Sequence, residues 1–407
     1  MEENNIKDRD FLATRRGELI TQIDFENHKE RIIRVFKEKK ILVLGGAGSI
    51  GSSFIYEISQ LSPNSIHIID PNENGLANLV RNLRSKNQKE SSIDLITSPL
   101  DFGSTITEHF IHKNGPYDMV FNFAAIKHVR SEKDVYSIHQ MFDTNVIKQS
   151  NFIDYLIRND VTDRYFAVST DKAANPVSLM GASKKIMELV LQYRHITEKK
   201  DLKTSTTRFA NVAFSNGSLL QSYPIRFQKR EPIPAPKDVT RYFVSHKEAA
   251  QICVLATLDI ERGDILVPKI ENEFKLYPII EVAKNFIESK GYEPILVNEK
   301  SEAYEIIRNT EINQYPIVVT NPDTSGEKEF EEFIGLHEET LNSKYKNFEI
   351  VKHSEFNIDK LKSFIKNFNL MLQGEVSLDR EKLIEDVRGI VGSFKHVDTG
   401  VNLDNRM

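Results

Sequence analysis

The sequence predicts an α/β protein with a doubly wound parallel sheet and a smaller C-terminal lobe. Short β-branched runs alternate with helical stretches of roughly ten or more residues over the first half of the chain. Strands separated in this way pair in parallel through right-handed crossovers. A glycine-rich turn follows the first of these runs directly, as in Rossmann-like nucleotide-binding folds.

The predicted elements follow one another in a regular order. Residues 1–39 are charged and predict a helical lead-in, and residues 40–210 predict the sheet domain. Within that domain we expect helices at about 51–61 and 73–84, and strands at 41–44, 66–69, 93–97, 119–123, 165–168 and 204–209.

The pattern loosens after about residue 210, where prolines stand at 224, 232, 234 and 236. We therefore predict a substrate-binding lobe over residues 211–340 and a C-terminal extension, of no assigned role, over residues 341–407. The stretch 326–348 is rich in Lys and Glu and predicts a solvated helical surface.

Composition excludes several classes of protein. The chain has 407 residues, with 54 Lys and Arg against 59 Asp and Glu, which gives a net charge of −5. A general nucleic-acid binder would need a basic face, and this slightly acidic balance of charges argues against one. The single cysteine, Cys253, excludes an intramolecular disulfide framework. The start has no signal-peptide pattern and no apolar run is long enough to span a bilayer, so we expect a cytoplasmic protein without membrane insertion. The histidines show no metal-ligand spacing.

A glycine loop, Gly45-Gly46-Ala47-Gly48-Ser49-Ile50-Gly51, joins the first strand to the first helix of the sheet domain. Gly45, Gly48 and Gly51 let the backbone turn sharply and approach a pyrophosphate at the helix N-terminus. Ser49 and Ile50 lie in the same turn. The spacing contains the dinucleotide fingerprint, so the loop predicts a cofactor site.

Three polar residues support this cofactor site. Asp70 ends the second strand, where a carboxylate would accept from both hydroxyls of an adenosine ribose and repel a 2′-phosphate. Asn72 follows it in Pro71-Asn72-Glu73, without an adjacent arginine. Asp101 follows the third strand and could meet the adenine edge. Together they favour NAD over NADP, although each carboxylate could also be a solvated loop residue.

The candidate catalytic segment follows the fifth strand. Ser169-Thr170-Asp171-Lys172 lies at the carboxyl edge, where doubly wound sheets bind their ligands. Met180 and Lys184 are four residues apart and share one helix face. This is the layout of a Tyr-x-x-x-Lys pair with Met in place of Tyr. A thioether cannot accept a proton, so Asp171 and Lys172 become the candidate acid–base pair.

An ordered set of motifs resembles the bacterial nucleotide-sugar 4,6-dehydratases of polysaccharide biosynthesis. These are extended short-chain dehydrogenases that act on UDP-N-acetylglucosamine and close analogues, and the branch with Met for Tyr is most similar. The motifs are residues 124–129 (AAIKHV), 169–176 (STDKAANP), 180–184 (MGASK), 207–212 (TRFANV), 217–218 (GS), 239–243 (VTRYF) and 326–328 (GEK).

The resemblance implies a reaction and roles for residues. Bound NAD would oxidise the sugar at C4 and reduce it at C6, so the cofactor is not consumed. Asp171 would take the 4-hydroxyl proton, Thr170 would bind the 4-oxygen, and Lys172 would remove the C5 proton. We expect Lys172 to be neutral, with its pKa lowered by burial, by Lys184 and by the nicotinamide. Ala124, Ala125, Asn145 and Lys184 would line the cofactor site, and Lys127, Met180, Asn211, Ser218 and Arg241 the nucleotide-sugar site.

Two other functions remain open at this point. A nucleotide-sugar 4-epimerase also begins with oxidation at C4, but it normally needs the missing tyrosine. A non-catalytic NAD-binding scaffold would explain Met180 but not Asp171 and Lys172. A UDP sugar is favoured and a GDP sugar possible as substrate. The resemblance also implies a homo-oligomer.

Overall fold

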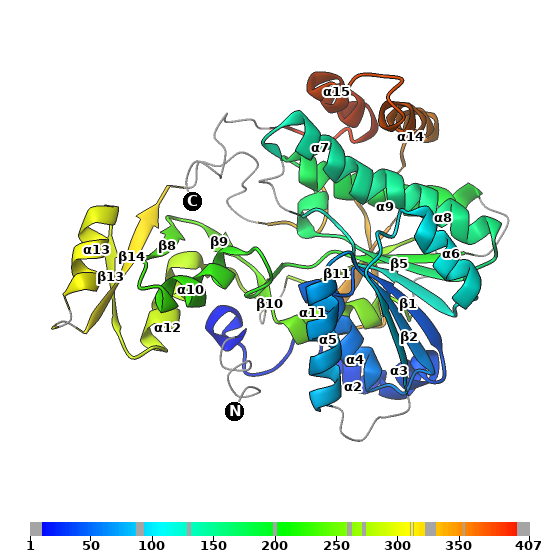
Figure 1. The fold of residues 1–407 in the computed structure, drawn as a ribbon. Coiled ribbons are helices and arrows are strands. Elements are labelled where there is room, and N and C mark those ends of the chain that lie inside the picture. The colour runs from blue at the N-terminus through cyan, green and yellow to red at the C-terminus, as the bar shows by residue number, and fades with distance from the viewer. Residues whose placement is uncertain are drawn as a thin grey trace.

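The computed structural model shows a large α/β body with a smaller lobe beside it (Figure 1). It describes residues 10–86, 93–127, 132–197, 202–258, 263–270, 274–309, 311, 313–321, 331–352 and 355–396. The motif residues 128–129 and 326–328 lie outside these ranges.

The body contains a nine-stranded sheet with the order β15-β16-β11-β6-β5-β4-β1-β2-β3. From β11 to β3 all neighbours in this order pair in parallel, and β16 and β15 extend the β11 side of the sheet by antiparallel pairing. This order confirms the predicted doubly wound fold. The strands are β1 (Lys40–Leu44), β2 (Ser65–Ile69), β3 (Asp94–Ser98), β4 (Met119–Asn122), β5 (Arg164–Val168), β6 (Lys203–Thr207), β11 (Ile265–Pro268), β15 (Thr340–Asn342) and β16 (Phe348–Val351).

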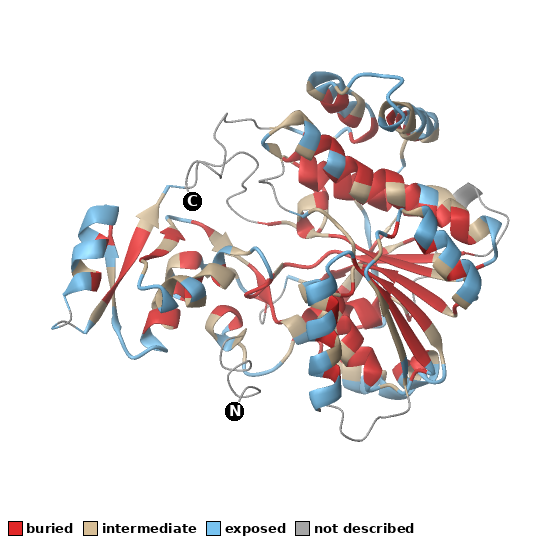
Figure 2. Cartoon of the chain, in the orientation of Figure 1, coloured by how far each residue is buried: buried red, intermediate tan, exposed pale blue. Residues whose placement is uncertain are grey.

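Helices cover both faces of this sheet, and each face has its own apolar core. The central strands are buried in Figure 2 because both of their faces are covered. One face holds α3 (Lys29–Phe36), α4 (Ser49–Ser59), α5 (Glu73–Lys86) and α11 (His246–Leu255), preceded in the chain by α2 (Gln22–Asn27). The other holds α6 (Thr105–Asn114), α7 (Val135–Phe142), η2 (Asp143–Ile147), α8 (Lys148–Arg158) and α9 (Leu179–Thr197).

The chain beyond residue 210 contributes to the body as well as to the lobe. The strand β11 pairs with β6, and β16 and β15 extend the same sheet. Two C-terminal helices, α14 (Ile358–Leu372) and α15 (Arg380–Ile390), pack their apolar residues into the core around α7, η2 and α9. The large sheet therefore draws on both sides of the boundaries that we predict at residues 210 and 340.

The lobe contains a second, three-stranded parallel sheet in the order β13-β14-β8. Its strands are β8 (Ile233–Pro236), β13 (Glu293–Val297) and β14 (Gln314–Thr320), and its helices are α10 (Leu219–Gln228), α12 (Ile279–Glu288) and α13 (Lys300–Arg308). Short two-stranded pairings connect it to the body: β7 (Asn211–Val212) with β10 (Phe243–Val244), and β9 (Thr240–Arg241) with β12 (Tyr277–Pro278).

One sequence prediction is wrong. We expect a solvated helix over residues 326–348, but the described part of this stretch forms turns and two antiparallel strands. The side chains of Glu331 and Glu338 are only 3% and 5% exposed. Their burial follows from pairing with cations on distant elements, which the local charge pattern does not reveal.

Among the described residues, no helix has both the length and the apolar character needed to cross a membrane.

Candidate active site

The glycine loop forms a tight turn between β1 and the N-terminus of α4. Gly45 has a φ of +72°, and a Cβ there would overlap the backbone nitrogen of Ala124. A Cβ on Gly51 would overlap the carbonyl oxygen of Gly45. Gly48 is the N-cap of α4, so Ser49, Ile50 and Gly51 form its first turn. This backbone could hold a pyrophosphate against the free N–H groups of the helix.

Asp70 is built into the same turn. Its Oδ2 accepts from the N–H of Ala47 at 3.0 Å, and its Oδ1 accepts from the N–H of Asn72 at 2.9 Å. The side chain of Asn72 in turn accepts from the N–H of Gly75 at 2.9 Å. Asp70 is buried, and each carboxylate oxygen keeps a second lone pair for a ribose hydroxyl. The arrangement therefore fits a dinucleotide.

Asp101 is bound differently. It accepts from Nζ of Lys148 at 2.6 Å and from the N–H of Gly103 at 2.8 Å. Burial would raise the pKa of Asp101, but these two donors outweigh it and hold the pKa below its usual value. Asp101 is thus an ionised carboxylate with protein partners on both oxygens.

Asn145 connects the segment after β4 to α9. Its Oδ1 accepts from the N–H of Ile126, while Nδ2 donates to the carbonyl of Ile126 and to Oγ of Ser183, each at 2.9 Å. Ala124 is fixed in the same segment because its N–H donates to Oδ1 of Asn122. Both protons of Nδ2 in Asn145 are used within the protein, so Asn145 ties the backbone at Ile126 to Ser183 of α9.

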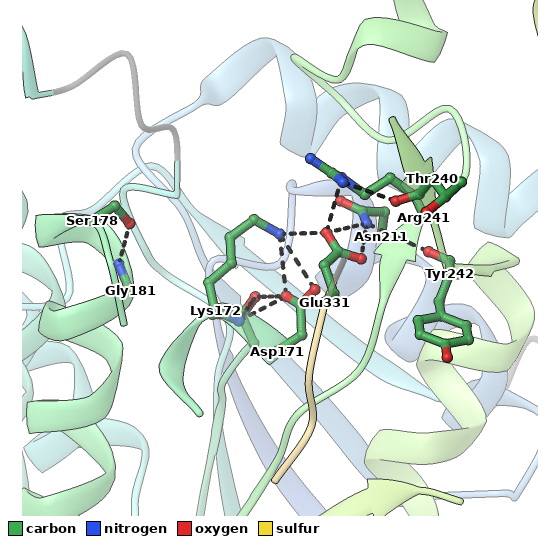
Figure 3. Close-up of polar contacts among 10 residues, drawn as sticks. Asp171, Lys172, Ser178, Gly181, Asn211, Thr240, Arg241, Tyr242 and Glu331 are labelled. Carbon is green, nitrogen blue, oxygen red and sulfur yellow. Dashed lines mark hydrogen bonds and ion pairs between the residues drawn. The ribbon is translucent and has the colours of Figure 1, made fainter. Parts of the chain in front are cut away.

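The helix α9 packs directly against the candidate catalytic segment, residues 169–172. Ser178 accepts from the N–H of Gly181 at 3.1 Å in the first turn of this helix (Figure 3). A Cβ on Gly181 would overlap the carbonyl oxygen of Lys172. Met180 is buried, and its N–H donates to Oε1 of Glu132 at 3.0 Å. Met180 therefore contributes apolar packing at the position where a proton-transferring tyrosine would stand.

Lys184 is a buried cation without an ion-pair partner in the described part of the chain. Its Nζ contacts Sδ of Met187 at 4.0 Å. Burial lowers the pKa of Lys184 to about 8, although the charge of Glu188 opposes this shift. A buried amine whose protein partner is a thioether fits a hydrogen-bonding ligand such as a ribose hydroxyl.

The centre of the site is a chain of four charged groups, shown in Figure 3. Thr170 donates to Oδ1 of Asp171 at 2.6 Å, and Asp171 is almost fully buried. Nζ of Lys172 lies 3.2 Å from Oδ1 of Asp171 and 3.1 Å from Oε1 of Glu331. The same Oε1 lies 3.3 Å from Nε of Arg241.

Asn211 completes this cluster. Its Nδ2 lies 2.7 Å from both carboxylate oxygens of Glu331 and donates to that carboxylate. Asn211 begins β7 and Arg241 ends β9, so two strands at the base of the lobe hold Glu331 over the carboxyl edge of the large sheet. Of the predicted residues, the structure thus brings together Thr170, Asp171, Lys172, Asn211 and Arg241.

The protonation of Lys172 corrects a prediction. We expect a lowered pKa, and burial alone would lower it. The carboxylates of Asp171 and Glu331 outweigh burial and raise the pKa of Lys172 above its usual value. The same ammonium, with Thr170, holds the pKa of Asp171 low in spite of burial. Lys172 is therefore an ammonium and Asp171 a carboxylate in this state.

Lys127 and Ser218 lie outside this cluster, and in the described part of the chain no hydrogen bond or ion pair joins them to it. Lys127 is exposed after β4. Ser218 is the N-cap of α10 and accepts from the N–H of Gln221. The N–H of Asn216 donates to Oγ of Ser49 at 2.8 Å, which brings the loop before α10 against the glycine loop.

A second buried network, made of ion pairs between α9, the end of β6 and Glu338, was not predicted from the sequence. Arg208 is fully buried and pairs with Glu188 of α9 at 2.6 Å and with Glu338 at 2.6 Å. Oε1 of Glu188 also accepts from Oγ of Ser169 at 2.6 Å, and Lys185 pairs with Glu338 at 2.5 Å. The network fixes α9 to the ends of β5 and β6 and so fixes the position of Lys184.

Glu331 is the main site residue that the sequence did not reveal. It stands three residues after the GEK motif at 326–328, in the adjacent pair Glu331-Glu332. This pair of acids close to the motif is the one signal in the sequence that could have pointed to Glu331. The sequence alone predicts a solvated surface here, because neighbours in the sequence cannot show which cations meet these acids in the fold.

The fold and the glycine loop define the class of protein as an α/β protein with a doubly wound, Rossmann-like sheet. The chain matches the polysaccharide biosynthesis protein family over residues 41–353, and it belongs to that family. This confirms the resemblance inferred from the motifs.

Individual relatives carry different names. An uncharacterized membrane protein of Methanocaldococcus jannaschii is 31% identical over 65% of this chain and 76% of the relative. A UDP-N-acetylglucosamine 4,6-dehydratase (inverting) of Campylobacter jejuni is 29% identical over 58% of this chain and 68% of the relative. A UDP-glucose 4-epimerase of Rickettsia conorii is 26% identical over 82% of this chain and 100% of the relative. The chain matches only 42% of CapD of Staphylococcus aureus and 52% of EpsC of Bacillus subtilis, about half of their lengths.

Solved structures share the fold at low identity. Pen from Bacillus thuringiensis superposes with a TM-score of 0.62 and 19% identity, covering 82% of this chain and 98% of the other. The Bordetella bronchiseptica enzyme WbmF in complex with NAD⁺ has a TM-score of 0.50 and 16% identity, covering 69% and 82%. These likenesses confirm the fold class.

Proposed function

We propose that this protein is an NAD-dependent nucleotide-sugar 4,6-dehydratase that converts an NDP-N-acetylglucosamine, preferably the UDP sugar, to its 4-keto-6-deoxy product. The observation that carries the proposal is the contact between the buried Asp171 and the partly exposed Lys172, 3.2 Å apart at the carboxyl edge of the sheet. A dehydratase needs two proton-transfer groups at this edge, one for the 4-hydroxyl and one for C5–H.

The cofactor site supports NAD. The backbone turn at Gly45–Gly51 could hold the pyrophosphate, Asp70 the adenosine ribose and Lys184 the nicotinamide ribose. NAD would supply oxidation at C4 and reduction at C6, so no outside reductant is needed. The carboxylate of Asp70 would repel the 2′-phosphate of NADP.

The chain's own groups then have distinct tasks. Asp171 accepts the 4-hydroxyl proton, since it is held as a carboxylate, and later gives that proton to the departing C6 hydroxyl. Thr170 holds Asp171 and the 4-oxygen in one geometry. Lys172 removes the C5 proton, which the neighbouring ketone has made acidic, once the lysine is an amine. Arg241 would bind the diphosphate with its planar guanidinium.

A 4-epimerase is the second candidate, because a relative named UDP-glucose 4-epimerase matches 82% of this chain. Both reactions begin with oxidation at C4. An epimerase has no step at C5 and therefore no use for the Lys172 amine. A non-catalytic NAD-binding scaffold is the third candidate, and it leaves the Asp171–Lys172 pair without a task.

The test is incubation of purified protein with UDP-N-acetylglucosamine and, separately, with GDP-N-acetylglucosamine, without added reductant. Mass spectrometry is expected to show loss of one water, and NMR a new C6 methyl group. A C4 epimer of unchanged mass would establish the epimerase instead. No change with either sugar, in protein shown to hold NAD, would contradict both activities and favour the scaffold.

A further inference from the structure

Glu331 contacts two cations and one amide in the candidate active site. It belongs to the chain after the lobe, and it meets Lys172 from 159 residues away in the sequence. Its Oε1 contacts Nζ of Lys172, Nε of Arg241 and Nδ2 of Asn211, at 3.1, 3.3 and 2.7 Å. Its side chain is 3% exposed, whereas that of Lys172 is 31% exposed. Glu331 therefore lies on the protein side of the Lys172 ammonium.

The ammonium state of Lys172 presents a chemical problem for the proposed reaction. An ammonium has no lone pair, so Lys172 must lose a proton before it can remove the C5 proton. The proton must go to a group within hydrogen-bond distance of Nζ or to water. Two described side-chain groups lie at that distance, Asp171 and Glu331.

Only one of these two groups is free for this task. Asp171 is committed to the 4-hydroxyl proton in the proposed mechanism. The other titratable groups around Glu331 are Arg241, which stays protonated, and Tyr242, whose pKa burial and the Glu331 charge raise. Neither is a base at neutral pH.

We propose that Glu331 accepts the ammonium proton of Lys172 and so produces the amine that acts at C5. The inference rests on the proposed dehydratase activity and deepens it. Burial and the nearby Asp171 carboxylate raise the pKa of Glu331 to about 7, although Lys172, Arg241 and Asn211 oppose the shift. This raised pKa makes Glu331 a stronger proton acceptor than an ordinary carboxylate. Glu331 is a positioning residue, because it acts on the sugar through Lys172.

The proton transfers balance over the whole cycle. An Nζ–H bond of Lys172 breaks and an O–H bond of Glu331 forms, so ammonium and carboxylate become amine and carboxylic acid. Lys172 takes the C5 proton and becomes an ammonium again. When C6 is reduced, Lys172 returns that proton to C5 and is left as an amine. Glu331 then gives its proton back, and both groups regain their starting charges.

Arg241 couples this transfer to substrate binding. In the structure its guanidinium lies 3.3 Å from Oε1 of Glu331 and stabilises the carboxylate form. A diphosphate bound to Arg241 neutralises much of that positive charge. The pKa of Glu331 then rises, which favours transfer of the proton from Lys172. Once Asp171 has taken the 4-hydroxyl proton, it is neutral. Lys172 then has one anionic partner fewer, so the pKa of Lys172 falls. The amine therefore forms when the sugar nucleotide is present.

The test compares Glu331→Gln with Glu332→Gln in the full-length protein loaded with NAD. The glutamine of Glu331→Gln keeps the size of the side chain and an oxygen for Asn211 but accepts no proton. Glu332 is the adjacent acid, and its carboxylate accepts from Asn175 outside the cluster. Two signals are measured after addition of UDP-N-acetylglucosamine: the absorbance of reduced nicotinamide, which reports C4 oxidation, and deuterium incorporation at C5 with product formation in D₂O.

Glu331→Gln is expected to retain nicotinamide reduction while C5 exchange and product formation fall by about 100-fold. Glu332→Gln is expected to behave as the wild type. In Glu331→Ala, added acetate is expected to restore part of the C5 exchange, since it can occupy the vacated space and accept the proton. A variant that lost folding alone would not respond to acetate.

Three outcomes would overturn the inference. Wild-type rates of C5 exchange in Glu331→Gln would show that water or another group takes the proton. Equal loss of nicotinamide reduction and C5 exchange in Glu331→Gln would show a structural role. If the wild-type protein gives no product from any nucleotide sugar, the proposed function fails and this inference fails with it. An active wild type with an equally active Glu331→Gln variant removes the inference alone.

Discussion

Oε1 of Glu331 lies 3.1 Å from Nζ of Lys172, and the two residues are 159 positions apart in the sequence. The contact joins the chain that follows the lobe to the chain that follows β5. The protonation state of Lys172, the candidate base for C5–H, therefore depends on Glu331, whose contact with Lys172 cannot be read from the local sequence. The same carboxylate meets Arg241, so the groups proposed for proton transfer and for diphosphate binding belong to one electrostatic unit.

Lys172→Met is expected to lower product formation by about 1000-fold or more, because Met has no group that can take the C5 proton. C4 oxidation, which depends on Asp171, should persist and be visible as reduced nicotinamide. The control is Lys229→Met, at an exposed lysine of the lobe. Product formation near the wild-type rate in Lys172→Met would remove Lys172 from the reaction.

Asp70→Asn is expected to weaken NAD binding by about tenfold and to narrow the preference for NAD over NADP. The amide loses the charge that strengthens hydrogen bonds to the ribose hydroxyls and that repels a 2′-phosphate. Isothermal titration calorimetry with both cofactors measures the change. Glu73→Gln, at the exposed start of α5, is the matched control. An unchanged ratio of the two affinities would contradict the assignment of Asp70.

Gly45→Ala is expected to lower the free energy of unfolding by about 1 kcal/mol or more and to abolish cofactor binding. Gly45 has a φ of +72°, and the new Cβ would overlap the backbone of Ala124. Gly17→Ala is the control, since a Cβ at Gly17 meets no atom within 4 Å. Urea unfolding and NAD titration of both variants test the prediction, which fails if the two substitutions have equal effects.

Glu338→Gln is expected to lower the free energy of unfolding at neutral pH by about 3 kcal/mol, because it leaves the buried Arg208 short of a charged partner. Burial would raise the pKa of Glu338, but Arg208 and Lys185 hold it at about 2, below its usual value of 4.5. A carboxylate whose pKa is lowered on folding stabilises the folded state at pH values above its unfolded-state pKa. For Glu338 this contribution disappears as the pH falls from about 4.5 to 2.

Urea unfolding at several pH values tests this linkage. The difference between wild type and Glu338→Gln should shrink as the pH falls through this window. Glu339→Gln is the matched control, because Glu339 is exposed and pairs with Lys352 at the surface. Glu339→Gln should change the free energy of unfolding little at every pH, because water screens this surface pair. A pH-independent difference for Glu338→Gln would contradict the charge interaction.

Most of the sheet domain could be predicted from local pattern. The strands at 41–44 and 66–69 and the glycine loop between them lie within a residue or two of β1, β2 and the observed turn. Each depends on neighbours in the sequence: alternation of apolar runs, and glycines that allow a positive φ. The C-terminal half was harder, because β11 and β16 join the large sheet across long stretches of lobe.

The sequence by itself determined the order of strands and helices in the first half of the chain, the glycine turn and the adjacency of Asp171 and Lys172, because these are properties of consecutive residues. Only the tertiary structure decided that Lys172 is an ammonium and that Glu331 and Arg208 are buried partners of the site. A pKa depends on every charge within a few ångströms, and a buried charge is stable only beside its counterion. Those neighbours come from distant parts of the chain, so folding alone brings them together.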